Sequence, residues 1–586
     1  MTRATTEPST DVADRFGAWA RVAVPMGLAL VLVPLLVSAI VTLTGTAPTP
    51  IRDQALMEMR VRDIGIHAVD LGLYSRDGWS HLGPLVFYTL ALPYRIIGSS
   101  TSGMVVGALI VNALSIVGIV AVARRIAGRR IALVMLLLVS VLVRALGALL
   151  VANPWVLFIT VLPFALFCLV VWALLLGRAW ALPAGAALAT WLVQTHVGYA
   201  PITLPLLGVG GIGLVVVSWR CGGERRATML RAGAWTAGIL VVVWALPAWD
   251  QVSGTGNFVR AARWFNDAKE GVHSLGEGIR VVVGQFAIVP DWVTGTRRVS
   301  PFNGETTLRT HLLWPVLLLP FAAALFVAVR RRSHRVVALG VVVGATVVLG
   351  VIAVARTIGT MYEYRMLFIW VVGGLAGAVI VWVLWDLVAD RFPRTDLIVV
   401  PVILLGLAML AGVEIDQATT APLADWNSRS TAAVLDRLTT KLDRHGGEII
   451  LRSETASSEW YLQGVLLGLD KRGFPARVRG TGGGLYPPDL SAGPGRDQAH
   501  LRVVAGPELA RLDRSQVAKI VAYGGPLPLH QELRALRAFE AKGTQLFAAL
   551  KAHTISTEEF LARNQRRNQA LLTAVALVPD DDPGSR

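Results

Sequence analysis

The densest group of side chains that could do chemistry lies between residues 52 and 81, just after the first long apolar run. Its members are Arg52, Asp53, Glu58, Arg60, Arg62, Asp63, His67, Asp70, Tyr74, Ser75, Arg76, Asp77, Trp79 and His81. An arginine can grip a phosphate through two parallel hydrogen bonds, and a carboxylate can take a proton from a hydroxyl. Carboxylates interleaved with arginines beside a membrane therefore suit chemistry on a lipid-borne phosphate. The alternative is a solvated loop whose charges pair with one another.

The rest of the chain is typical of an integral membrane protein. Its 586 residues are 54% hydrophobic and 16% charged, whereas a soluble globular chain carries roughly 25% charged residues. A membrane-spanning helix needs about 20 apolar residues. Eleven runs meet this need: Val22–Leu43, Met104–Ala123, Ile131–Ala152, Pro154–Leu176, Ala179–Val197, Pro201–Ser218, Ala232–Ala248, Leu312–Val329, Val336–Ala355, Met366–Trp385 and Leu397–Val413. Most of the formal charge of +16 lies in short loops between these runs, so we expect no nucleic-acid partner.

The arginines between the runs predict the orientation. Leu85–Ile97 is short and contains Pro93 and Arg95, which suits an interfacial or re-entrant helix better than a span. If it does not cross and the N-terminus is cytoplasmic, the arginines of the short loops lie inside, as the positive-inside rule requires. They are Arg124, Arg125, Arg129, Arg130, Arg178, Arg220, Arg225, Arg226, Arg231, Arg330, Arg331, Arg332, Arg335, Arg391 and Arg394. We therefore predict eleven spans in the plasma (cell inner) membrane, with the C-terminus outside.

This topology predicts three parts: a cytoplasmic segment (1–21), a transmembrane domain (22–413) with outer loops at 44–103 and 249–311, and an extracytoplasmic domain (414–586). The last part has a soluble composition in which strands and helices alternate, which favours an α/β domain. The predicted strands are Glu448–Arg452, Ala476–Arg479, Leu501–Ala505 and Ala518–Ala522, and the predicted helices are Ser457–Lys471, Leu529–Ala552 and Thr557–Leu577.

The order of these features resembles the front end of the GT-C superfamily of polyprenyl-phosphate-sugar-dependent membrane glycosyltransferases. The stretch that carries the resemblance is Arg60-Val61-Arg62-Asp63, Tyr74-Ser75-Arg76-Asp77-Gly78-Trp79-Ser80-His81-Leu82-Gly83-Pro84-Leu85 and Leu92-Pro93-Tyr94-Arg95. It is similar to envelope proteins related to arabinosyl- and mannosyltransferases, although Leu82 stands where their pattern has a proline. Later landmarks include Asn153-Pro154-Trp155, Gln194–Tyr199 and Tyr364-Arg365, so the resemblance covers roughly residues 20–413.

The resemblance implies an inverting transfer in which an acidic residue of the first outer loop deprotonates the acceptor hydroxyl. Asp63 matches that residue best because it follows Arg60 and Arg62, with Asp70, Asp53 and Asp77 as successively weaker alternatives. An ion pair with one of those arginines is the structural alternative for Asp63. The expected contacts to the donor phosphate and substrate are Arg60, Arg62, Arg76, His81, Arg144, His196, Arg356 and Arg365.

The sequence assigns no metal site and no cofactor. Neither His67 nor His81 forms a recognisable ligand spacing with His196, and two cysteines are too few for a thiolate cluster. A divalent metal is therefore possible in principle but unsupported. For His196 itself, a structural hydrogen-bonded role and a substrate contact are weighed almost equally.

We predict from these features a GT-C-like helical membrane glycosyltransferase with a C-terminal α/β domain. It would move arabinofuranose or mannose from a polyprenyl-phosphate donor to an envelope glycan or lipid acceptor at the outer face of the bilayer. A carrier or flippase for lipid-linked saccharide would use the same arginines without a base. Such a protein is expected to show matched halves or broken midplane helices, and the sequence shows neither. A non-catalytic scaffold of the same fold is the third alternative.

Overall fold

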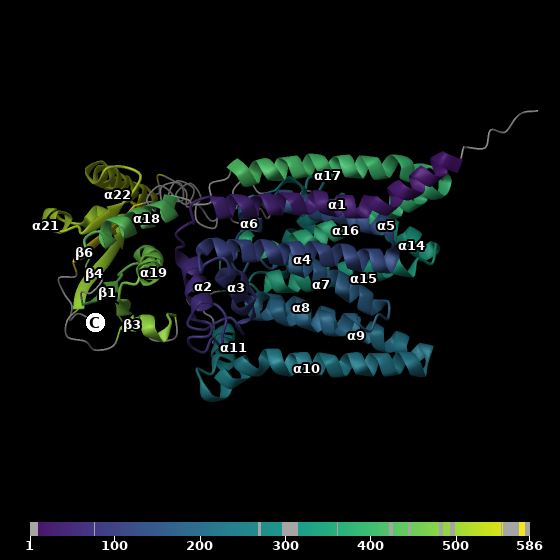
Figure 1. Cartoon of the computed structure of the whole chain (residues 1–586), viewed down its shortest axis with the longest axis horizontal. Helices are drawn as coiled ribbons and strands as arrows, with labels where there is room; N and C mark the ends of the chain where they lie inside the picture. The colour runs from purple at the N-terminus through teal and green to yellow at the C-terminus, as the bar shows by residue number, and fades with distance from the viewer. Residues whose placement is uncertain are drawn as a thin grey trace, which may run out of the picture.

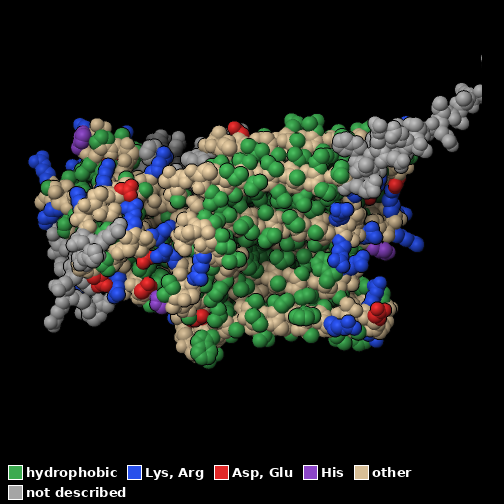
Figure 2. Space-filling view, viewed as in Figure 1, with side chains coloured by type: hydrophobic (Ala, Val, Ile, Leu, Met, Phe, Trp, Pro, Cys, Tyr) green, Lys and Arg blue, Asp and Glu red, His purple; other side chains and the backbone are tan. Residues whose placement is uncertain are grey.

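The structure is a computed structural model that describes residues 10–75, 77–267, 271–295, 314–359, 361–420, 426–442, 447–479, 485–492, 498–552, 554 and 574–579. A bundle of long helices is joined at one end to a smaller α/β domain (Figure 1). Apolar side chains cover the middle of the bundle, and Lys and Arg gather toward its two ends (Figure 2). This distribution is what a bilayer-spanning bundle requires.

Seven of the described helices are long and apolar enough to cross a membrane. They are α1 (Thr10–Thr44), α4 (Thr101–Ala127), α9 (Ala200–Cys221) with the 3-10 turn before it, α10 (Gly223–Ser253), α15 (His334–Ala355), α16 (Phe368–Arg391) and α17 (Thr395–Thr420). These seven confirm a multi-pass membrane protein. The other four predicted spans coincide with shorter helices, namely α5 (Arg129–Leu146), α7 (Val161–Leu175), α8 (Ala181–Thr195) and α14 (Leu318–Arg330). The count of eleven crossings stays a prediction.

Two of those shorter helices differ from the predicted runs for a local reason. The run Ile131–Ala152 is interrupted at Gly147, whose φ of 79° ends α5 before the short α6 (Ala148–Val151) begins. Only glycine adopts this backbone conformation readily. The run that starts at Pro154 becomes an α-helix only at Val161, after a stretch of turns.

Short helices cover the end of the bundle that carries the α/β domain. They include α2 (Arg52–Asp63), α3 (Leu85–Ile96), α11 (Asn257–Asp267), α12 (Leu275–Val283) and α13 (Asp291–Thr294). The α3 helix has 12 residues, or about 18 Å of rise, which is shorter than the roughly 30 Å hydrocarbon core. It lies beside α2 at this end (Figure 1), and its interfacial position stays a prediction.

The C-terminal domain is built on a six-stranded sheet with the order β3-β2-β1-β4-β6-β5. The strands are β1 (Glu448–Arg452), β2 (Ala476–Arg479), β3 (Ser491–Ala492), β4 (Gln498–Ala505), β5 (Ala522–Gly524) and β6 (Val575–Pro579). Pairing is parallel from β3 to β4 and antiparallel on both sides of β6. The helices α18 (Trp426–Thr439), α19 (Ala456–Lys471), α20 (Pro507–Arg511), α21 (Arg514–Ala518) and α22 (Leu529–Lys551) complete it.

Two predictions for this domain were wrong in part. The strand predicted at Ala518–Ala522 begins only at Ala522, because a capping box between Asp513 and Gln516 starts α21 in front of it. Most of the helix predicted over Thr557–Leu577 lies outside the described residues, but its end is strand β6. The apolar residues Val575–Val578 are buried between β4 and β5, so tertiary pairing decides their conformation.

The hydrophobic core of the bundle continues through α2 into the α/β domain. The backbones of the two parts approach closely at Gly464 of α19, where there is no side chain. A Cβ added there would lie 2.6 Å from the carbonyl oxygen of Pro50, just before α2. The two parts are therefore packed directly against each other, with α2 and α19 at the junction.

Candidate functional site

The helix α2 carries the candidate residues that the sequence places between 52 and 63. Its apolar side chains are buried, from Ala55 to Val61, and Asp53 in the first turn and Arg62 in the last turn complement the helix dipole. Asp53 and Asp63 stand at its opposite ends, about 15 Å apart along the axis at 1.5 Å per residue. The two carboxylates therefore belong to different environments.

Asp53 faces an aromatic group on the membrane domain. The indole Nε1 of Trp155 donates a hydrogen bond of 2.9 Å to Asp53 Oδ2. The Trp155 ring lies 5.3 Å from the ring of Tyr364, which stacks on Tyr362 at 5.2 Å with an interplanar angle of 9°. The neighbouring Gln54 donates to Asn153, two residues before that tryptophan. One carboxylate and three aromatic side chains are thus held side by side.

A guanidinium and two imidazoles continue this group. The Arg365 guanidinium carbon lies 5.2 Å from the Tyr362 ring and within electrostatic range of His196. The His196 ring is 4.6 Å from the ring of His81. We call the set Asp53, Trp155, Tyr364, Tyr362, Arg365, His196 and His81 the Asp53–His81 row.

Burial favours the neutral form of His81, and one hydrogen bond indicates which ring nitrogen carries the proton. Burial lowers the pKa of His81 to about 4. Its Nδ1 faces the backbone N–H of Val197 at 3.3 Å, so Nδ1 accepts and Nε2 carries the proton. The loop that holds it is fixed by Asn257, whose side chain accepts from Ser80 N and donates to Ser80 O, both at 2.8 Å.

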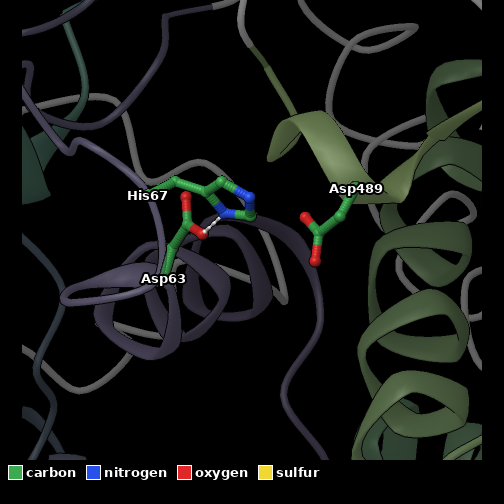
Figure 3. Close-up of side chains that lie close together, drawn as sticks. All are labelled: Asp63, His67 and Asp489. Carbon is green, nitrogen blue, oxygen red and sulfur yellow. Dashed lines mark hydrogen bonds and ion pairs between the residues drawn. The ribbon is translucent and has the colours of Figure 1, made fainter.

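Asp63, at the other end of α2, is bonded to histidine. The side chain of Asp63 is 4% exposed, and its Oδ1 lies 2.5 Å from Nδ1 of His67. This hydrogen bond and the negative charge raise the pKa of His67. Asp489, in the 3-10 turn Pro488–Leu490 of the C-terminal domain, faces the same two side chains (Figure 3).

The two arginines of α2 differ in their surroundings. Arg62 forms a 2.8 Å ion pair with Asp470 of α19, so the hydrogen-bonded partner of Asp63 is His67 rather than this arginine. Arg60 is half-buried, and this burial lowers the pKa of Arg60 while the charge of Asp63 opposes that shift. Its charge thus lies near Asp63 rather than in the Asp53–His81 row.

The remaining predicted residues are spread over the end of the bundle that carries the α/β domain. Asp70 is half-buried, and burial together with the charge of Asp250 raises its pKa. Arg144 of α5 donates to the carbonyl of Val293 in α13, and Arg356 is exposed at the end of α15. Arg76 lies outside the described residues. The structure therefore brings His81, His196 and Arg365 together, and it adds Asp53 to them.

Sequence reasoning gave no functional role to four side chains of these groups. Trp155 and Tyr364 stand in landmark motifs, and Tyr362 lies just outside them. Their aromatic side chains near Arg365 are the signal that the sequence offers. Asp489 gave no signal, because it lies in the other domain in a loop rich in proline and glycine.

No family model matches the chain, and no curated protein matches it. Among solved structures, the chain is similar to ArnT from Cupriavidus metallidurans bound to undecaprenyl phosphate. The identity is 13% over 85% of this chain and 94% of that chain, with a TM-score of 0.47. The same protein in the apo state is similar at 13% identity over 84% and 93% of the two chains, also with a TM-score of 0.47. An oligosaccharyltransferase from Archaeoglobus fulgidus in the apo form is similar at 10% identity over 75% of this chain and 63% of that chain, with a TM-score of 0.37.

Proposed function

We propose that this protein is a GT-C-type glycosyltransferase that takes a sugar from a polyprenyl-phosphate donor at the extracytoplasmic face of the plasma membrane. The observation that carries the proposal is the Asp53–His81 row. A carboxylate, stacked aromatic rings and a guanidinium meet there at the end of an apolar bundle. A carboxylate can remove a proton, aromatic rings can pack against the face of a sugar, and a guanidinium can hold a phosphate.

Each part of the row has a role in an inverting transfer. Arg365 holds the lipid phosphate, and Trp155 and Tyr364 contact the sugar. The carboxylate removes the proton of the acceptor hydroxyl, whose oxygen then forms a bond to the anomeric carbon. The bond from that carbon to the phosphate oxygen breaks, and the polyprenyl phosphate leaves with its negative charge beside the guanidinium. The neutral His81 offers its Nε2 proton as a hydrogen-bond donor.

Three carboxylates compete for the role of base, and the geometry favours Asp53. Asp63 is hydrogen-bonded to His67 beside Asp489 of the C-terminal domain, at the end of α2 opposite to Asp53. Asp70 has a raised pKa from burial and from the charge of Asp250. Asp53 accepts a hydrogen bond from Trp155, whose ring contacts Tyr364, the residue next to Arg365. We therefore move the assignment of the base from Asp63 to Asp53.

The choice of sugar and acceptor in this proposal rests on the sequence resemblance. It favours arabinofuranose or mannose as the sugar and a glycan or lipid of the cell envelope as the acceptor. The C-terminal domain, packed over α2, would hold that acceptor or a partner protein.

The test is transfer by the full-length protein in liposomes that contain labelled polyprenyl-phosphate arabinofuranose or mannose, with envelope lipid extract as acceptor. Asp53→Asn should lower the turnover about 10²–10⁴-fold, the usual contribution of a general base, without loss of donor binding. Asp63→Asn and Asp70→Asn are the matched controls and should retain most turnover. Loss of activity in Asp63→Asn with normal turnover in Asp53→Asn would return the base to Asp63. Donor movement across the bilayer without any transfer would identify a carrier instead.

A further inference from the structure

A second group of chemically capable side chains lies at the opposite end of α2 from Asp53. Asp63 is the last residue of that helix, His67 follows one turn later, and Asp489 comes from the C-terminal domain. Each offers one ligand atom, and these atoms all lie within 4.8 Å of one another. Figure 3 shows the three side chains meeting from two directions, two from the first outer loop and one from the facing domain.

One carboxylate oxygen of this group lacks a hydrogen-bond partner among the described residues. Oδ2 of Asp63 is buried and has no hydrogen-bond partner within the described part of the chain, although the whole side chain is only 4% exposed. A buried carboxylate oxygen without a partner is unfavourable, because it has lost its water and gained nothing in return. The second carboxylate, Asp489, adds like charge nearby. A positive ion among the three side chains would remove both costs.

The donor atoms indicate which kind of ion would fit. Two carboxylates and one imidazole suit zinc or manganese, whereas magnesium and calcium prefer ligands that are all oxygen. His67 and Asp489 are open to solvent, so water can complete the coordination. The hydrogen bond between Asp63 and His67 keeps these two side chains adjacent.

We propose that Asp63, His67 and Asp489 form a site for a divalent transition-metal ion, which links the carboxyl end of α2 to the C-terminal domain. The ion bridges the two parts of the molecule at a point where no backbone connection joins them. It lies a helix length from Asp53, so its role is to fasten the domain over the outer loop. The proposal does not depend on the reaction that the protein catalyses.

The experiment measures metal directly on purified full-length protein in detergent. The protein is stripped with a chelator, loaded with Zn²⁺ or Mn²⁺, and freed of unbound metal by gel filtration before elemental analysis. Competition with a chromophoric chelator gives the affinity. The variants are His67→Ala and Asp489→Asn, and the matched control is Asp77→Asn, an exposed carboxylate of the same loop outside the group.

We expect about one ion per chain in the wild type and in Asp77→Asn, and an affinity at least about 100-fold weaker in His67→Ala and Asp489→Asn, since loss of even a supporting group costs 10–100-fold. The apparent melting temperature of the wild type should rise with metal concentration, because the ion binds the folded state, and that of both variants should not. Wild-type protein that retains neither metal, or binding equal in all four proteins, would overturn the site. Asp489→Asn makes the result decisive even if His67→Ala folds poorly, because Asp489 is exposed on the surface of its own domain.

Discussion

Glu58 of α2 and Lys471 of α19 form an ion pair of 2.5 Å, although 413 positions separate them in the sequence. The Glu58 side chain is fully buried, and it also accepts hydrogen bonds from the hydroxyls of Tyr94 at 3.0 Å and Thr101 at 2.7 Å. One carboxylate thereby ties together α2, α3, α4 and the C-terminal domain. It lies between Asp53 and the proposed metal group, so it helps to hold both ends of α2 in place.

Removal of the lysine should destabilise this junction strongly. Lys471→Met keeps the length of the side chain but leaves the buried Glu58 without its cation, a change that typically costs 3–5 kcal/mol. Chemical unfolding in detergent measures the loss, with Lys551→Met at the exposed end of α22 as the control. The double variant Glu58→Gln with Lys471→Gln should recover part of the stability, because no buried charge remains. An unchanged unfolding curve for Lys471→Met would mean that the pair contributes nothing.

The contact between α19 and the start of α2 should tolerate no added methyl group. A Cβ at Gly464 would lie 2.6 Å from the carbonyl oxygen of Pro50 and 2.9 Å from Ile51. Because backbone must move to make room, Gly464→Ala should cost about 1–3 kcal/mol, as overpacked cores do. Gly406→Ala on α17 is the control, since nothing lies within 4 Å of its Cβ, and it should leave the melting temperature equal or slightly higher. Equal melting temperatures for both variants would show that the junction is loosely packed.

The buried imidazole of His81 should make the fold sensitive to mild acid. Its pKa is about 4 in the folded protein against 6.5 for a free histidine, so the fold favours the neutral form. This stabilisation is complete above pH 6.5 and is lost as the pH falls from 6.5 toward 4, by up to about 1.4 kcal/mol per pH unit. His81→Asn retains an acceptor for Val197 N but does not titrate in this window. Melting temperatures measured from pH 7.5 to 4.5 should therefore fall less steeply in the variant, and parallel curves would contradict the assignment.

The chain carries a natural probe of its own orientation. Cys221 is exposed and unpaired at the end of α9, whereas Cys168 is buried. The arginine distribution predicts that residue 222 faces the cytoplasm and Ser99 faces outside. A membrane-impermeant maleimide should therefore label Cys221 in inverted vesicles and not in intact cells. Ser99→Cys in a Cys221→Ser background should show the opposite pattern, and labelling of Cys221 from outside would reverse the predicted topology.

Sequence alone determined the features that depend on local composition. Apolar runs of sufficient length predicted the long helices, since a bilayer accepts little else. Short-range patterns also predicted that α3 is short and that β1, β2 and β4 are strands, because runs of apolar residues between turn residues are visible within ten residues.

Tertiary structure decided what depends on distant partners. Hydropathy could not show that Asp53 meets Trp155 and leads to Arg365, that Asp489 reaches Asp63, or that the end of the predicted last helix is strand β6. A carboxylate looks the same in sequence whether it is a base, a ligand or half of an ion pair. Its role follows from the charges and rings that folding brings within a few ångströms, and those come from segments hundreds of residues apart.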